Sequence, residues 1–232
     1  MTFSLTQMLH QNTRLRPTGL ATEFQGRGRT HAEFMDRVAR LAAGLRQAGM
    51  KRGDRVGMLA LNSDRYFEMY FAIWWAGAAV NPINTRWAAP EIAFSLDDCG
   101  TAVVILDDTF IGMKDALFQQ SATLKTLIHA TDGAPAEGTL GYEALIAAHE
   151  PAEDAAACGE ELAGVFYTGG TTGRPKGVML THTNLVLNGL LLLVPVPFDA
   201  RAVCLHSLPL FHLAGLSFLL RAVMRGCRNI IH

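Results

Sequence analysis

Hydrophobic and polar positions predict a long helix after residue 30. Thr30 and Glu33 stand three residues apart, the spacing of a helix-capping box. Apolar residues then recur at steps of four, three and four from Phe34 to Leu45, which places them on one face of a helix. Gly49 is a typical residue to end such a helix. The pattern therefore predicts a helix that is buried along one side.

After Gly49, short apolar runs alternate with helical patterns. Ser63 can cap a helix that is apolar on nearly every side, which predicts deep burial. Pro90 suits the first turn of another helix, and Gly100 suits its end. This alternation favours an α/β fold with a mostly parallel sheet flanked by helices. Strands are predicted at residues 55–61, 79–83, 102–106, 125–130, 162–167 and 177–182.

The pattern in the later part of the chain predicts a second, incomplete subdomain. The most apolar run, Leu185 to Phe198, is interpreted as a buried helix followed by a loop. Residues 216–232 predict a helix, a turn and the start of a strand, so we expect an incomplete subdomain with exposed apolar surface at this end. The polar segments 132–138 and 150–159 are interpreted as surface loops within one domain spanning 1–232, with a domain boundary there as the alternative.

Composition narrows the classes of function. Half of the 232 residues are hydrophobic and 18% are charged, as in globular proteins. The formal net charge of -1 offers no broad positive surface to nucleic acid or to an acidic membrane. The four cysteines lack metal-binding spacing, so they predict no metal site. The start has no signal-peptide stretch, and the longest apolar run is too interrupted to span a bilayer, which favours a cytoplasmic protein.

One segment carries a specific chemical signal. TGGTTGRPK joins two predicted strands, and it combines glycines, which let the backbone approach a ligand, with hydroxyl donors and one mobile cation. Successive amides in such a turn form a concave anion site. A purely structural hairpin would explain the glycines but not the threonines and the lysine. The predicted phosphate-binding residues are Thr168, Gly169, Gly170, Thr171, Thr172, Gly173 and Lys176.

This loop differs from the Walker A pattern of P-loop nucleotide hydrolases. In that pattern, Gly-Lys is followed by Ser or Thr at the start of a helix. Here Lys176 stands between Pro175 and Gly177, and a strand is predicted to follow. A P-loop hydrolase is therefore disfavoured.

YTGGTTGRPKGV resembles the phosphate-loop signature of the adenylate-forming (AMP-binding) superfamily, YTSGTTGxPKGV, with Gly169 in place of the common serine. Residues 51–87 and 90–100 resemble the family's segments before that loop, and PLFHLAG at 209–215 resembles the motif that follows it. The resemblance is to acyl-CoA synthetases and covers nearly the whole chain.

The resemblance implies an AMP-forming acyl-CoA ligase that uses ATP, Mg²⁺ and CoA. A carboxylic acid attacks the α-phosphorus of ATP and expels pyrophosphate, and the thiol of CoA then displaces AMP. Residues 168–173 and Lys176 would bind the β- and γ-phosphates. Phe211 and His212 would line the acid site, with His212 as the catalytic residue that orients the carboxylate. Without the resemblance, His212 would be interpreted as a packed histidine. The apolar surroundings of this motif favour a fatty or aromatic acid.

The family's later motifs and its mobile C-terminal domain, which carries a catalytic lysine, do not occur in these 232 residues. The chain is therefore interpreted as an N-terminal portion of the domain, and we expect it to be inactive alone. Two alternatives stay open: an adenylation domain that loads a carrier protein, and a non-catalytic fragment that acts as a binding module. Whether the protein forms homo-oligomers is also open.

Overall fold

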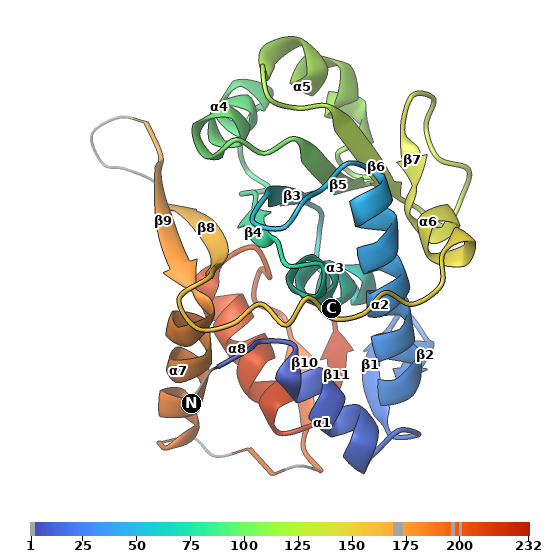
Figure 1. Cartoon of the computed structure of the whole chain (residues 1–232), viewed down its shortest axis with the longest axis vertical. Helices are drawn as coiled ribbons and strands as arrows, with labels where there is room; N and C mark the ends of the chain where they lie inside the picture. The colour runs from blue at the N-terminus through green and yellow to red at the C-terminus, as the bar shows by residue number, and fades with distance from the viewer. Residues whose placement is uncertain (1–2, 169–173, 196–197, 200) are drawn as a thin grey trace.

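The computed structural model describes residues 3–168, 174–195, 198–199 and 201–232, which form two sheets with helices around and between them (Figure 1). The large sheet has the strand order β7-β6-β5-β3-β4-β8-β9, and the small sheet has the order β10-β11-β1-β2. The strands are β1 (Leu20–Phe24), β2 (Arg27–Thr30), β3 (Arg55–Leu59), β4 (Ala79–Pro82), β5 (Val103–Asp107), β6 (Thr126–Ala130), β7 (Leu140–Gly141), β8 (Leu162–Thr168), β9 (Lys176–Thr181), β10 (Val203–His206) and β11 (Arg228–Ile231).

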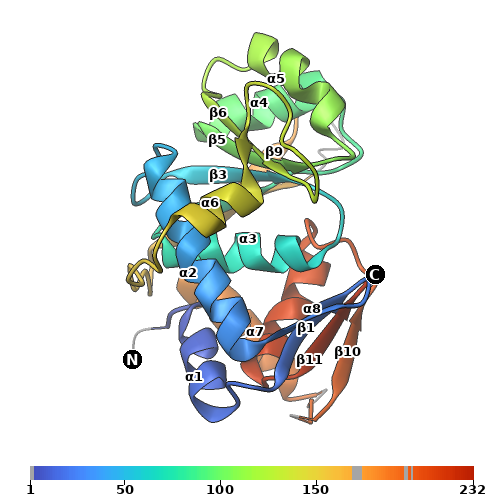
Figure 2. The same ribbon diagram turned by 90° about the vertical axis from the view of Figure 1, so that its right-hand side faces the viewer.

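Neighbouring strands of the large sheet are parallel, except for the antiparallel pair of β8 and β9. The predicted α/β class with a mostly parallel sheet is thereby confirmed. Helices cover both faces, with α4 and α5 on one face and α2, α3 and α6 on the other (Figure 2). The helices are α1 (Gln7–Leu15), α2 (His31–Gln47), α3 (Asp64–Trp75), α4 (Ala89–Cys99), α5 (Lys114–Gln120, preceded by the 3₁₀ turn Ile111–Met113), α6 (Tyr142–Ala148), α7 (His182–Leu193) and α8 (Leu213–Met224).

The residues that were predicted to begin and end helices do so in the structure. The Thr30 hydroxyl accepts a hydrogen bond from the Glu33 amide at 3.2 Å, and the Glu33 carboxylate accepts one from the Thr30 amide at 2.8 Å. Gly100 ends α4 with a φ of +67°, in the left-handed region that favours glycine. The Ser63 hydroxyl caps α3 by accepting the Tyr66 amide at 3.2 Å. Every residue of α3 is buried between the two sheets, which confirms the predicted deep burial.

The pattern predicts no element before Thr30, but α1, β1 and β2 form there. The β1 strand is half polar and buries only Ala21 and Thr22. It pairs in parallel with β11, where Thr22 lies opposite Asn229. Since this partner lies some two hundred residues away, local periodicity gives no sign of the pairing.

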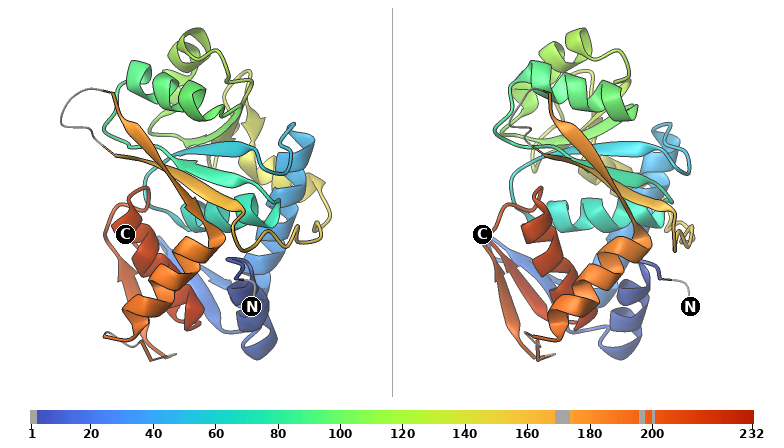
Figure 3. Two further views of the ribbon diagram at one scale, coloured as in Figure 1. Left: turned by 60° about the vertical axis from the view of Figure 1, so that its left-hand side comes forward. Right: turned by 90° about the vertical axis from the view of Figure 1, so that its left-hand side faces the viewer.

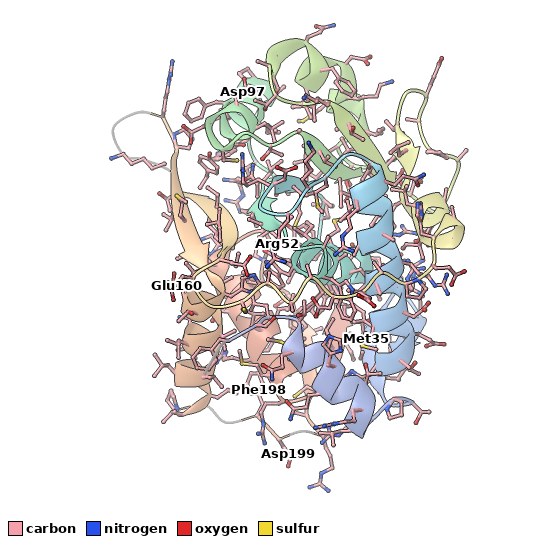
Figure 4. The ribbon with its side chains drawn as sticks, viewed as in Figure 1. Met35, Arg52, Asp97, Glu160, Phe198 and Asp199 are labelled. Atoms are coloured by element: carbon pink, nitrogen blue, oxygen red, sulfur yellow. The ribbon has the colours of Figure 1, made fainter. Side chains whose placement is uncertain are left out.

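The helix predicted near Leu185 begins earlier, at His182, and its predicted burial is wrong. Among the described residues, α7 packs against α8, β8 and β9, and its outer face is uncovered, so that Leu191 is 68% exposed. The segment after α7 runs to Asp199, at the end of the molecule farthest from Asp97 of α4 (Figure 4). Exposed apolar side chains near this end of the chain agree with the expectation from the sequence: Val178, Met179, Leu187, Leu190, Leu191, Val194, Val203, Leu205 and Leu208.

Ion pairs join the small sheet to α3. The Glu68 carboxylate, which is completely buried, lies 2.7 Å from the Arg37 guanidinium and 3.0 Å from that of Arg29. It also accepts a hydrogen bond of 2.9 Å from the hydroxyl of Tyr142. One turn earlier on the helix, buried Asp64 lies 2.7 Å from Arg27 of β2. Partners on β2, α2 and α6 therefore surround two buried carboxylates of α3.

The protein is expected to lose stability as the pH falls from about 6.5 towards 4. Burial lowers the pKa of His182 and of His206 to about 4. The unfolded chain, with an imidazole pKa of about 6.5, binds more protons than the folded chain in this window, so the free energy of unfolding falls as the pH falls. Urea unfolding at a series of pH values measures the slope. His206→Gln, which keeps a polar group opposite Asn229, should make the slope shallower, and an unchanged slope would contradict this account.

Candidate functional site

The predicted phosphate loop connects β8 to β9, which form an antiparallel hairpin along one side of the molecule (Figure 3). Thr168 pairs with Lys176 as the last residue pair before the loop. The residues between them that carry the predicted cradle, Gly169, Gly170, Thr171, Thr172 and Gly173, lie outside the described residues. A strand follows the loop, as predicted, where a Walker A loop would be followed by a helix.

Lys176 is available to a ligand at the mouth of the hairpin. Its side chain is exposed, as is that of Thr168. No carboxylate within the described ranges lies close enough to the Lys176 ammonium to form an ion pair. A cation without an ion-pair partner among the described residues, next to a glycine-rich segment of the sequence, suits a phosphate group.

Two contacts hold the hairpin against α4, and the sequence analysis did not assign their residues a role. The Tyr167 hydroxyl donates a hydrogen bond to the Asp98 carboxylate at 2.7 Å. Together with burial, this bond raises the pKa of Tyr167. On the other side of the loop, the Arg174 guanidinium lies 5.4 Å from the centre of the Phe94 ring. Tyr167 and Arg174 both belong to the YTGGTTGRPKGV motif. Their place in the motif could have indicated a role for them from the sequence.

Phe211 and His212 lie in the turn that begins α8. His212 is exposed and is the N-cap residue, and its Nδ1 accepts a hydrogen bond from the Ala214 amide at 3.2 Å. In the neutral imidazole, an accepting Nδ1 leaves the proton on Nε2, which can then donate to a carboxylate. Phe211 is partly buried against the main core. The structure thus gives His212 a capping role and leaves its second nitrogen available.

A groove of about 320 Å³ runs between α7 and α8, and Leu213, the residue after His212, is among the residues that line it. Leu213, Leu216 and Leu220 of α8 line one side, and Leu180 and Leu185 line the other. Its only polar side chains among the described residues are Asn184, Asn188 and Ser217.

Neither Thr168 nor Lys176 is among the residues that line the groove between α7 and α8. Leu180 borders the groove, whereas Lys176 lies four residues earlier on β9, which corresponds to about 14 Å along a strand. The β9 strand therefore connects the predicted phosphate loop to this groove.

A larger cavity of about 780 Å³ lies where β3, β5, β6 and β11 end. It is lined by Phe211, by arginines that include Arg65 and Arg86, and by acids that include Asp107 and Asp108. Ligands of open α/β sheets commonly bind beyond the carboxyl ends of the strands. Phe211 therefore borders this cavity and does not line the groove between α7 and α8.

The described residues contain neither a cluster of metal-binding side chains nor a membrane-spanning helix. No group of three or more His, Cys, Asp or Glu side chains within those residues could hold a metal ion. None of the described helices is both long and apolar enough to cross a bilayer.

Comparison with known proteins gives consistent matches. The family described as AMP-binding enzyme matches residues 9–232. Feruloyl-CoA synthase of an Amycolatopsis species is 34% identical over 231 residues, which cover 96% of this chain and 42% of that protein. Long-chain-fatty-acid–CoA ligase of Thermus thermophilus is 32% identical over 204 residues, which cover 87% of this chain and 37% of the ligase. This chain thus spans about two fifths of the length of these relatives.

Two solved structures superpose closely on this chain. The inhibitor-bound N-terminal domain of FACL13 from Mycobacterium tuberculosis superposes with a TM-score of 0.88 at 30% identity, and the match covers 99% of this chain and 57% of that one. The anthranilate CoA ligase AuaEII, in complex with anthranoyl-AMP, gives a TM-score of 0.94 over 100% of this chain and 45% of that one. At 24% identity, the second match concerns the fold alone.

Proposed function

Since the chain belongs to the family of AMP-binding enzymes, we propose that it is part of a ligase that joins a carboxylic acid to CoA at the expense of ATP. The observation that carries the proposal is the β8–β9 hairpin, which presents an exposed Lys176 at the mouth of the TGGTTGRPK loop. The relatives named above are CoA ligases or synthases, which supports this reaction class.

In the proposed reaction the acid carboxylate attacks the α-phosphorus of ATP, and pyrophosphate leaves. The thiol of CoA then attacks the acyl carbon, and AMP leaves. Thr168, residues 169–173 and Lys176 would bind the β- and γ-phosphates, where amide and ammonium donors stabilise charge on the leaving pyrophosphate. Mg²⁺ would accompany ATP and neutralise part of that charge. We further propose that this takes place in the cytoplasm.

We propose that His212 and Phe211 border the acid. The Nε2 proton left by the capping bond of His212 can donate to the substrate carboxylate and orient it. The groove between α7 and α8, which Leu213 borders, is lined mainly by leucines. A fatty or aromatic acid would bury apolar surface there, at about 25 cal/mol per Å², whereas acetate has little to bury.

Formation of acyl-CoA is the expected result when the full-length gene product is incubated with ATP, Mg²⁺, CoA and a panel of fatty and aromatic acids. Acid-dependent release of pyrophosphate measures the first step, and mass spectrometry of the thioester measures the second. Offering a pantetheinylated carrier protein in place of CoA separates the two acceptors. The 232-residue chain alone is expected to release no pyrophosphate above background. The absence of acid-dependent pyrophosphate release from the full-length product with every acid would refute the proposed reaction.

A further inference from the structure

The turn that carries Phe211 and His212 is held by side chains from a distant part of the sequence. The amide of Leu210 donates to the Oδ1 atom of Asn62 at 2.9 Å, and the carbonyl of Leu210 accepts from the Tyr70 hydroxyl at 2.7 Å. Both main-chain polar groups of Leu210 therefore bond to side chains. Leu210 is 1% exposed, so either group would be costly to leave without a partner.

Asn62 bonds to this segment at more than one point. Its Nδ2 atom donates to the carbonyl of Leu208 at 2.9 Å and lies 3.3 Å from that of His232. One amide thus bridges the main chain of Leu208 and Leu210, in the way that a neighbouring strand would. Asn62 itself stands in the short turn between β3 and α3, next to the capping residue Ser63.

The other side of the segment rests against α8 without free space. A Cβ atom added to Gly215 would lie 2.3 Å from the carbonyl oxygen of Pro209, closer than real contacts allow. Asn62, Tyr70 and the first turn of α8 therefore confine residues 208–212 from three directions. Tyr70 is itself completely buried on α3, within the main core.

From this geometry, and resting on the proposed function, we propose that Asn62 and Tyr70 are positioning residues for the acid site. Neither side chain needs to touch the substrate. They fix the main chain directly before Phe211 and His212 and so fix where the Nε2 proton of His212 is presented. A displacement of about 1 Å in such a group can cost as much as a hundredfold in rate, so a rigid support has a direct effect on catalysis.

Deleting one hydroxyl tests the role of Tyr70. In the full-length gene product, Tyr70→Phe should raise the KM for the acid, or lower kcat/KM for the acid, by roughly tenfold or more, with the KM for ATP unchanged. Tyr66→Phe is the matched control, because the Tyr66 hydroxyl is buried one turn away on α3 and, within the described residues, makes no hydrogen bond to the main chain of residues 208–212. A residue that only stabilises the fold would reduce the active fraction and leave the KM for the acid as it was.

Asn62 provides an independent arm of the test. Asn62→Ala removes the bonds to Leu208, Leu210 and His232, whereas Asn62→Asp keeps an acceptor for the Leu210 amide and loses the donor to the other two carbonyls. Both variants should raise the KM for the acid, because Asp places a carboxylate oxygen against the carbonyl oxygens of Leu208 and His232. Hydrogen exchange of a peptide covering 207–213 should be faster in Asn62→Ala and Tyr70→Phe than in the wild type and Tyr66→Phe.

The outcomes separate the two proposals. If the wild type shows no acid-dependent pyrophosphate release, the proposed function fails, and so does the catalytic part of this inference. If the wild type is active but Asn62→Ala and Tyr70→Phe keep its KM for the acid, the inference is overturned and the proposed function stands. Unchanged hydrogen exchange at 207–213 in both variants would also overturn it.

Discussion

Glu68→Ala is expected to lower the free energy of unfolding by about 3–5 kcal/mol, the usual cost of removing one partner from a buried ion pair. The substitution leaves Arg37 and Arg29 without the carboxylate that lies 2.7 and 3.0 Å from them. It also leaves the buried Tyr142 hydroxyl without its acceptor. Arg37 keeps Glu143 and Arg29 keeps Asp64 as partners, so the large effect comes from the loss of a buried carboxylate that two guanidinium groups and one hydroxyl share. Urea or thermal unfolding of the purified chain measures it.

Asp36→Ala is the matched control. Asp36 and Arg40 form an ion pair four residues apart on the outer side of α2, and the Asp36 side chain is 48% exposed. An exposed pair of this kind contributes about 0.3–0.5 kcal/mol. Glu68→Gln, which keeps the shape and loses the charge, should fall between the two. If Glu68→Ala cost no more than Asp36→Ala, the buried pairs would not be what joins the small sheet to α3.

Lys176→Ala is expected to reduce kcat/KM for ATP in the full-length gene product by roughly ten- to a hundredfold, which corresponds to loss of a charge-assisted hydrogen bond of about 1.5–3 kcal/mol. Lys176 is exposed at the start of β9, so the substitution should leave the melting temperature nearly unchanged. Initial rates of pyrophosphate release at varied ATP give the parameter.

Lys125→Ala serves as the control, because Lys125 is also exposed and lies just before β6, away from the hairpin in the same sheet. Lys176→Arg tests the geometry of the contact: it keeps the charge but replaces a compact ammonium with a planar fork, so it should restore only part of the activity. Wild-type ATP kinetics in Lys176→Ala would remove the phosphate-binding role given to this residue.

The sequence predicted the elements whose signals are local. The Thr30–Glu33 box, Gly100 and the apolar residues of α3 each depend on neighbours within one or two turns, and all three predictions are confirmed. The hairpin was predictable because its motif has a fixed spacing. The roles of individual residues in the phosphate and acid sites stay predictions, and five of them lie outside the described residues.

What could not be predicted depends on distant partners. Arg27 and Arg29 look like ordinary surface residues of a polar strand, and only the fold places buried Asp64 and Glu68 beside them. The apolar pattern of α7 gives no indication of which of its faces would be covered. Asn62 acquires its role through Leu208 and Leu210, almost 150 residues later in the chain.

The pairing of β1 with β11 has a consequence for synthesis. Residues 20–24 are made early, but their parallel partner at 228–231 emerges only after about two hundred further residues. At a translation rate of roughly 5–20 residues per second, that delay is on the order of 10–40 s. During this time the nascent hairpin of β1 and β2 has an open edge, to which chaperones or other chains can bind. The small sheet can therefore complete its pairing only after β11 has been made, long after β1 and β2.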